Sequence, residues 1–261
     1  MLDGVQFWQR AASLPSIPTF SHKLDNILGS DGVPLGSLIE ILGLPGTGKT
    51  QLCLQLCASV QIPEALGGLN AEALYIDTNT NFVLNRFQEI LSACSTKCQK
   101  LLCKANNKNE EQSLKQLHYV NAFGLEKFCA FMHQLPKFIA EHNSIRLIVI
   151  DSIAFPFKEG ITAKQRTGLL FRQMAELQRL AVQNRIAVVL TNEMSTRLGL
   201  STGAVVGSFG DAWAHRCNVR LLLSAPDDPN GDRLALILKS NIAPEAVAPF
   251  QITEEGIRDV D

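Results

Sequence analysis

The chain has 261 residues, of which 46% are hydrophobic, and this is enough for one large core or for one core with a small appendage. Its formal net charge of −1 argues against a protein that coats nucleic acid by bulk electrostatics, so any such contact must come from local basic loops. No apolar run approaches the roughly 18 residues of a membrane span, and we expect no membrane partner.

The cysteines indicate reduced thiols. There are seven, an odd number, in a chain in which we find no secretory signal peptide. Cys53 with Cys57, and Cys94 with Cys98, have the spacing at which a helix would present two metal ligands, but neither pair is accompanied by a histidine pair or a CxxC motif. We expect buried thiols on apolar helix faces, with zinc as the alternative.

The start of the chain, Met1 to Phe20, is expected to form an arm that lies on the domain rather than in its core, because Pro15 and Pro18 favour extended backbone. A single domain should then span residues 21–261. It begins with an amphipathic helical turn closed by glycine, after which a tight turn leads into the first strand.

A phosphate-binding loop follows that strand. The stretch Gly43-Leu44-Pro45-Gly46-Thr47-Gly48-Lys49-Thr50 matches the pattern GxxxxGK[ST] in every fixed position. Residues 37–42 before it predict a short buried strand, and residues 51–57 after it carry apolar side chains at helical spacing. This arrangement directs backbone N–H groups and the positive end of the helix dipole at one small volume, which suits a triphosphate. A glycine-rich turn that matches by chance is the alternative.

The residues of this loop have separate roles. Glycines allow the backbone amides to wrap the phosphates where a Cβ would block their approach. Lys49 supplies a positive charge to the β and γ oxygens, and the Thr50 hydroxyl can ligate Mg²⁺. The predicted nucleotide-binding residues of this segment are Gly43, Leu44, Pro45, Gly46, Thr47, Gly48, Lys49, Thr50 and Gln51.

The middle of the chain continues the alternation of strands and helices. Residues 73–77, Ala-Leu-Tyr-Ile-Asp, predict a second buried strand whose carboxyl end belongs to the ligand edge of an open α/β sheet. Helical spacing runs over residues 82–103, and the polar break at residues 105–112 is interpreted as a surface loop. A short strand at residues 118–120 and a helix at residues 125–141 follow.

A second strong signal lies at Ile145-Arg146-Leu147-Ile148-Val149-Ile150-Asp151-Ser152. Four consecutive aliphatic residues without alternation predict a central parallel strand covered on both faces. In a chain with a phosphate loop, the terminal Asp151 is placed to hold Mg²⁺ through water, which is the Walker B role. The alternative is an aspartate that caps the following turn.

The remaining segments complete the expected sheet. Residues 166–183 predict an amphipathic helix, and residues 186–192 predict another buried strand whose polar end shares the sheet edge with the other acidic strand ends. Four glycines among residues 194–210 predict a mobile loop. Residues 219–224 and 234–239 predict an antiparallel hairpin.

The order of these parts resembles the ATPase core of the RecA/RadA recombinase superfamily, and it looks most like the C-type eukaryotic recombinase paralogue. The segments that carry this closer likeness are Gly48-Lys49-Thr50-Gln51-Leu52-Cys53, Gln61-Ile62-Pro63-Glu64 and Ile153-Ala154-Phe155-Pro156-Phe157. The resemblance runs from about Phe20 to Asp261. We find no counterpart of the family's N-terminal helical DNA-binding domain or of its phenylalanine-alanine tether, so we expect no long homofilament and a need for a paralogue partner.

The resemblance implies an α/β core with a mostly parallel sheet between helices, MgATP bound at protomer interfaces and DNA contacted by two loops. Those loops map to about residues 153–165 and 194–210, and the predicted DNA contacts are Lys158, Lys164, Arg166 and Arg197. A solvated basic surface is the alternative. By the same resemblance, Arg86 lies over the adenine, and Lys239 reaches the γ-phosphate of a neighbouring subunit in trans.

Two residues depart from the family pattern. Asn79 stands where the family has the glutamate that polarises the attacking water, and an amide cannot accept that proton. Glu193 stands where the family has a glutamine that senses the γ-phosphate, and a carboxylate repels a phosphate unless Mg²⁺ or a basic residue intervenes. Glu193 has either taken over water activation, acting with Lys49 in catalysis, or hydrolysis has decayed while binding persists.

These residues are compatible with three functions. The first is an ATP-binding recombinase paralogue that acts in homologous-recombination repair, including meiotic recombination, within a complex of related paralogues on single-stranded or branched DNA. The second is a nucleotide-gated scaffold with negligible turnover, and the third is a metabolic phosphotransferase, for which no acceptor domain or lid is apparent. Residence in the nucleus is implied by resemblance alone, since no basic import signal is evident.

Overall fold

The structure is a computed structural model. It describes residues 3, 5, 15–29, 31–102, 110–158, 160–196, 205–207, 209, 211–226 and 231–260.

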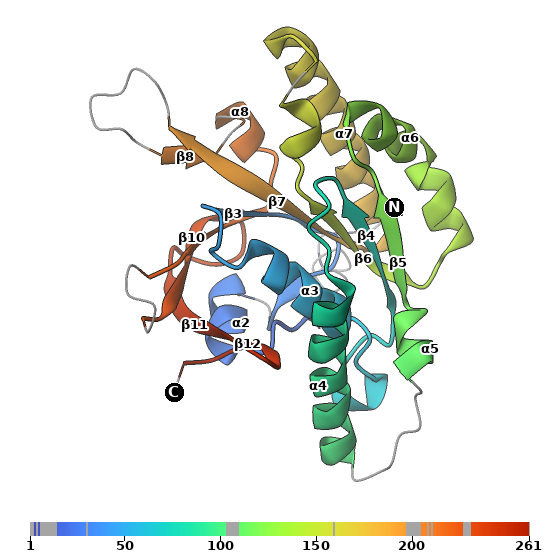
Figure 1. Ribbon diagram of the computed structural model, residues 1–261, viewed down its shortest axis with the longest axis vertical. Coiled ribbons are helices and arrows are strands. Elements are labelled where there is room, and N and C mark those ends of the chain that lie inside the picture. The colour runs from blue at the N-terminus through green and yellow to red at the C-terminus, as the bar shows by residue number, and fades with distance from the viewer. Residues whose placement is uncertain are drawn as a thin grey trace.

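One ten-stranded sheet forms the centre of the molecule (Figure 1). Its strand order is β12-β11-β10-β9-β3-β7-β6-β4-β5, and β8 pairs with β7 outside this path. The part from β9 to β5 is parallel, and β10, β11 and β12 are added in antiparallel fashion. This confirms the predicted α/β fold with a mostly parallel sheet and a C-terminal antiparallel hairpin. The strands of this sheet are β3 (Leu38–Gly43), β4 (Glu72–Asp77), β5 (Leu117–Asn121), β6 (Ile145–Asp151), β7 (Ala187–Thr196), β8 (Val205–Gly207), β9 (Val219–Ser224), β10 (Arg233–Ser240), β11 (Val247–Thr253) and β12 (Gly256–Arg258).

Helices cover both faces of the sheet, with α3 and α4 on one side and α6 and α7 on the other (Figure 1). The helices are α2 (His22–Leu28), α3 (Lys49–Ser59), α4 (Leu84–Leu102), α5 (Glu110–Leu114), α6 (Leu125–Glu141), α7 (Ala163–Asn184) and α8 (Asp211–Ala214), with 3-10 turns η1 (Glu64–Leu66) and η2 (Phe155–Phe157). In the described part of the chain, none of them combines the length and the apolar character needed to cross a membrane.

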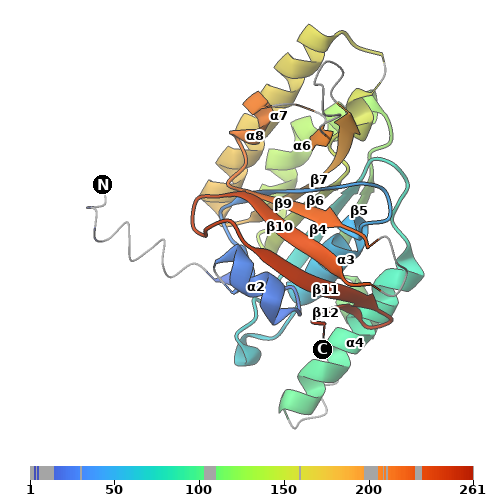
Figure 2. The same ribbon diagram turned by 90° about the vertical axis from the view of Figure 1, so that its left-hand side faces the viewer.

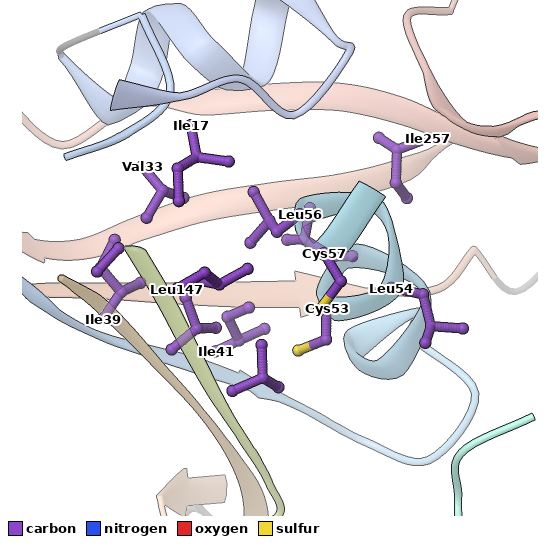
Figure 3. Close-up of a cluster of buried hydrophobic side chains, with 14 of the residues drawn as sticks. Ile17, Val33, Ile39, Ile41, Cys53, Leu54, Leu56, Cys57, Leu147 and Ile257 are labelled. Carbon is purple, nitrogen blue, oxygen red and sulfur yellow. The ribbon is translucent and has the colours of Figure 1, made fainter. Parts of the chain in front are cut away.

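The buried strands divide their side chains between two hydrophobic clusters. Along β6, Leu147 and Val149 enter the cluster that includes α3, whereas Ile148 and Ile150 enter the cluster on the α6 and α7 side. Figure 3 shows part of the first cluster, in which Leu147 lies near side chains from β3 and α3. Because both faces of β6 are buried, its sequence is a continuous aliphatic run without polar alternation.

The N-terminal segment is more closely integrated than its sequence indicated. β1 (Ser16–Ile17) pairs with β2 (Val33–Pro34), and Ile17 is fully buried in the first cluster. α2 packs against β10 and β11 (Figure 2). The expected arm at residues 1–20 therefore contributes at least one residue to the core. Burial of the apolar Ile17 side chain is favourable, and the extended backbone between Pro15 and Pro18 allows it.

The helices α7 and α5 depart from the predicted elements. α7 begins at Ala163 instead of residue 166, because Thr162 forms a capping box with Gln165. α5 begins at Glu110, inside the surface loop expected at residues 105–112, and residues 103–109 lie outside the described part. Helix α6 has the predicted bounds.

The expected mobile loop at residues 194–210 is partly regular. β7 continues to Thr196 and pairs with β8, so strand pairing satisfies backbone groups at both ends of this stretch. Residues 197–204, 208 and 210 lie outside the described part. The hairpin of β9 and β10 is confirmed, but β11 and β12, which extend it, were not predicted.

Candidate nucleotide-binding site

The phosphate-binding loop joins β3 to α3, so it opens directly at a helix N-terminus. Gly48 has φ of 102°, and a Cβ there would lie 2.7 Å from the Cδ1 atom of Ile252. A Cβ on Gly43 would lie 2.4 Å from Oγ1 of Thr47. Glycine at both positions lets the loop backbone pack closely against Thr47 and Ile252, so the loop can keep the tight path that ends at the α3 N-terminus.

Lys49 lies over its own loop. Its Nζ donates hydrogen bonds to the carbonyls of Gly43 at 2.7 Å and Leu44 at 2.9 Å. Burial lowers the pKa of Lys49, and the negative charges of Asp151 and Glu193 oppose that effect. The ammonium is therefore held at the loop by neutral carbonyls, which phosphate oxygens can replace with stronger, charge-assisted hydrogen bonds.

Asp151 lies at the centre of a hydrogen-bond cluster. Its Oδ2 accepts hydrogen bonds at 2.7 Å from the hydroxyls of both Thr50 and Tyr75, and its Oδ1 accepts one at 2.5 Å from Thr191. Burial, followed by the charge of Asp151, raises the pKa of Tyr75, which keeps the phenol protonated as a donor. The hydroxyl of Thr50 and this carboxylate are hard oxygen ligands that fit Mg²⁺ together with phosphate and water.

Asp77, at the same sheet edge, shapes the adjacent turn. Its carboxylate accepts hydrogen bonds from the backbone N–H groups of Asn79 at 3.1 Å, Asn81 at 3.2 Å and Phe82 at 3.1 Å, and from the hydroxyl of Tyr119 at 3.1 Å. The β4 to β6 register places Asp77 opposite Asp151, as the sequence predicted for these strand ends. Asp77 therefore holds the turn that carries Asn79 to the pocket.

A pocket of about 610 Å³ opens above the loop and the strand ends. Its lining residues are Pro45, Gly46, Gly48, Lys49, Thr50, Gln51, Asn79, Asn81, Asp151, Ser152, Glu193, Arg233 and Ile252. Sequence reasoning missed Asn81, Ser152, Arg233 and Ile252. The last two come from β10 and β11, and Arg233 donates to the carbonyl of Gly46 at 3.2 Å. No local motif marks them, because their role depends on a long-range return of the chain.

Arg86, the predicted adenine contact, is held by hydrogen bonds beside α3, the helix that follows the phosphate loop. Its Nε donates to the side chain of Gln51 at 2.8 Å, and its guanidinium also donates to the backbone carbonyls of Thr253 at 2.5 Å and Glu254 at 2.6 Å. It is not among the residues that line the pocket. Its planar group connects α4, α3 and the turn between β11 and β12, and its stacking on a base stays a prediction.

The predicted DNA contacts have different surroundings. Lys158 forms an ion pair with Glu193, with Nζ and Oε2 separated by 2.7 Å. Lys164 is exposed in the first turn of α7, and Arg166, two residues later, is half-buried. Arg197 lies outside the described residues.

Lys239, the predicted trans contact, is engaged within its own chain. Its Nζ donates to the carbonyls of Ala214 at 3.2 Å, His215 at 2.9 Å and Cys217 at 2.8 Å, just after α8. A cation at the end of a helix satisfies carbonyls that have no partner inside the helix. Its role toward a second subunit stays a prediction.

The cysteine pairs lie mainly in the core. Cys53, Cys57 and Cys94 are buried, and Cys98 is half-buried. Burial raises the pKa of Cys94 to about 12, and it raises the pKa of Cys53 and Cys57 as well. Across the described ranges, no three histidine, cysteine or acidic side chains gather in a way that could hold a metal ion.

Comparison with known proteins identifies the family. Residues 10–260 match the family described as Rad51. The chain is 36% identical over 255 residues to the "DNA repair protein RAD51 homolog 3" of Cricetulus griseus, covering 93% of this chain and 68% of that protein. It is 30% identical over 254 residues to the protein of the same description from Dictyostelium discoideum, covering 94% and 66%. It is 31% identical over 263 residues to the "DNA repair and recombination protein RadA" of Metallosphaera sedula, covering 99% and 76%. The chain therefore belongs to the Rad51 family.

Proposed function

We propose that this protein binds MgATP and acts in homologous-recombination DNA repair as a recombinase paralogue. The observation that supports it best is the convergence of Lys49, Thr50 and Asp151 at one pocket above a glycine-built phosphate loop. In this site, Lys49 would hold phosphate oxygens, while Thr50 and Asp151 would hold Mg²⁺. The bound metal would supply charge neutralisation for the phosphates.

Nucleotide binding is tested with Lys49→Ala and a fluorescent ATP analogue in the presence of Mg²⁺. We expect the variant to lose binding by at least about 100-fold, because a charged hydrogen-bond donor to the β and γ oxygens disappears. Lys127→Ala is the matched control, since Lys127 is an exposed lysine on α6, away from the pocket. Equal affinity of Lys49→Ala and wild type would refute the proposal.

The protein is expected to hydrolyse ATP slowly. Asn79 lines the pocket where the family has a water-polarising glutamate, and an amide cannot accept the proton of the attacking water. Asn79→Glu should raise the single-turnover rate of phosphate release by about 10- to 100-fold. Fast release by the wild type that Glu193→Gln leaves unchanged would contradict this view.

A nucleotide-gated scaffold is the second candidate, and the same Asn79 favours it. In that case ATP would fix the interfaces of the protein without being consumed. Single-turnover release from the wild type decides between the two, because a scaffold should retain its nucleotide intact over the lifetime of the complex. A metabolic phosphotransferase is the least supported alternative.

The finer features of this proposal follow from the family. They comprise membership of a complex with related paralogues, contact with single-stranded or branched DNA, a role in meiotic recombination and residence in the nucleus. The half-exposed and exposed cations at the start of α7 support phosphate contact without base readout. Copurification from source tissue, followed by turnover assays of the intact complex with DNA, tests these features together.

A further inference from the structure

Glu193 places a carboxylate at the phosphate end of the pocket. The pairing of β3 with β7 sets Glu193 opposite Gly43, the first residue of the loop. Glu193 lines the pocket together with Lys49, and its negative charge acts on the Lys49 ammonium. A terminal phosphate held by Lys49 would therefore lie near the negative charge of Glu193, and like charges at short range repel each other.

Lys158 forms an ion pair with this carboxylate. Its Nζ lies 2.7 Å from Oε2 of Glu193, and it also lies 5.3 Å from the ring centroid of Phe155, where the aromatic face favours a cation. The Lys158 and Glu193 side chains are 47% and 35% exposed, so solvent screens the charges of this pair only in part. Lys158 comes from the segment after β6 that the family resemblance assigned to DNA contact, but its ammonium pairs with Glu193, which lines the nucleotide pocket.

We propose that Lys158 is a positioning residue of the nucleotide site, which neutralises Glu193 so that a nucleotide with a γ-phosphate can bind. The inference rests on the proposed MgATP binding and deepens it. Without Lys158, the carboxylate of Glu193 would disfavour a triphosphate more than a diphosphate, since the diphosphate lacks the group that approaches Glu193. Lys158 thereby sets the preference of the site for ATP over ADP.

The test measures the affinities of four forms of the full chain for a fluorescent non-hydrolysable ATP analogue and for fluorescent ADP, each with Mg²⁺. The forms are wild type, Lys158→Met, Glu193→Gln and the double variant. Lys158→Met should weaken binding of the ATP analogue by about tenfold and binding of ADP by less than about threefold. In the double variant, the affinity for the ATP analogue should return to within about twofold of wild type, because the Glu193 carboxylate that Lys158 neutralises is then absent.

Two further variants make the result specific. Lys158→Gln keeps a hydrogen-bond donor without the charge and should behave as Lys158→Met. Lys127→Met removes an exposed lysine far from the pocket and should change neither affinity. Because each of these side chains is at least partly exposed, the variants should keep the wild-type circular dichroism spectrum.

The outcomes separate this inference from the proposed function. Equal losses for the ATP analogue and ADP in Lys158→Met, or a double variant as weak as Lys158→Met, would overturn the role of Lys158 alone. A wild-type protein that binds neither nucleotide would overturn the proposed function and this inference with it.

Discussion

A single buried carboxylate joins three neighbouring strands beside the site. Glu40 on β3 is fully buried and accepts hydrogen bonds from Asn192 at 2.6 Å, Trp213 at 2.7 Å and Arg220 at 2.6 Å. Arg220 is the charged partner, with 17% of its side chain exposed. An ionised group in the core persists only when its hydrogen bonds and its charge are satisfied, and Glu40 meets both conditions.

Removal of this carboxylate should be costly. We expect Glu40→Ala to lower the free energy of unfolding by about 3 kcal/mol, because it leaves Arg220 without its ion pair and Trp213 and Asn192 without their acceptor. Urea denaturation with an unchanged m-value measures this loss. Glu40→Gln, which keeps an acceptor, should lose less, and a Glu40→Ala loss below about 1 kcal/mol would show that the cluster contributes little.

The residues of the site differ in how far the sequence could reveal them. Lys49, Thr50 and Asp151 stand in local motifs whose chemistry is readable from the order of residues. The ion pair of Lys158 with Glu193 could not be predicted, because Lys158 follows η2 and Glu193 lies within β7, and the two meet only through the strand order of the sheet. Sequence reasoning did identify the problem that Glu193 poses, which is a carboxylate near a phosphate.

At the scale of elements, the C-terminal segment stabilises the N-terminus of α2. Asp259 accepts a hydrogen bond from the hydroxyl of Ser21 at 2.6 Å and from the backbone N–H groups of His22 and Lys23, each at 3.0 Å. Burial raises the pKa of Asp259, but the hydrogen bonds from Ser21, Lys23 and His22 outweigh that effect and leave the pKa below its usual value. The ionised carboxylate therefore favours the folded state.

This contact predicts a pH-dependent loss of stability in Asp259→Ala. At pH 7 the variant should be less stable than wild type by about 1 kcal/mol, as for the loss of a helix N-cap. Since the folded pKa is lowered, the advantage of wild type is fully present above the unfolded pKa of about 3.9 and disappears as the pH falls through the folded value. Urea titrations between neutral and acidic pH measure it, and a difference that grows below pH 4 would contradict this assignment.

Element boundaries show which sequence signals are sufficient. The capping box of Thr162 and Gln165 was present in the sequence, so the earlier start of α7 was predictable from side-chain chemistry. β11 was harder, because Pro249 lies inside it and proline argues against a strand. β12 pairs only with residues 251–253 of β11, so Pro249 lies outside that pairing and its missing N–H costs no hydrogen bond with β12.

At the scale of the whole molecule, the pocket is closed by parts of the chain that are far apart in sequence. The loop and the ends of β4, β6 and β7 form its base, and Ile252 of β11 reaches back over Gly48. The centre of the parallel half could be predicted, since β3, β4, β6 and the start of β7 are buried, mainly aliphatic runs. The return of β11 and β12 over the loop could not, because it depends on packing of β12 against α3 and of Ile252 against Gly48 and not on a local pattern.

Binding at the loop should stabilise the complete domain. β3 leads into the loop and contributes side chains to both hydrophobic clusters, so the ligand should shift the global transition and not a local one. At a concentration 100 times its dissociation constant, MgATP should raise the free energy of unfolding by about 2.7 kcal/mol. Thermal unfolding followed by circular dichroism and by the fluorescence of tryptophan, which includes buried Trp213, should show one coincident shift. Lys49→Ala should show none, and EDTA should reduce the wild-type shift because Thr50 and Asp151 then have no metal to bind. An equal shift in Lys49→Ala would place the stabilising nucleotide elsewhere on the molecule.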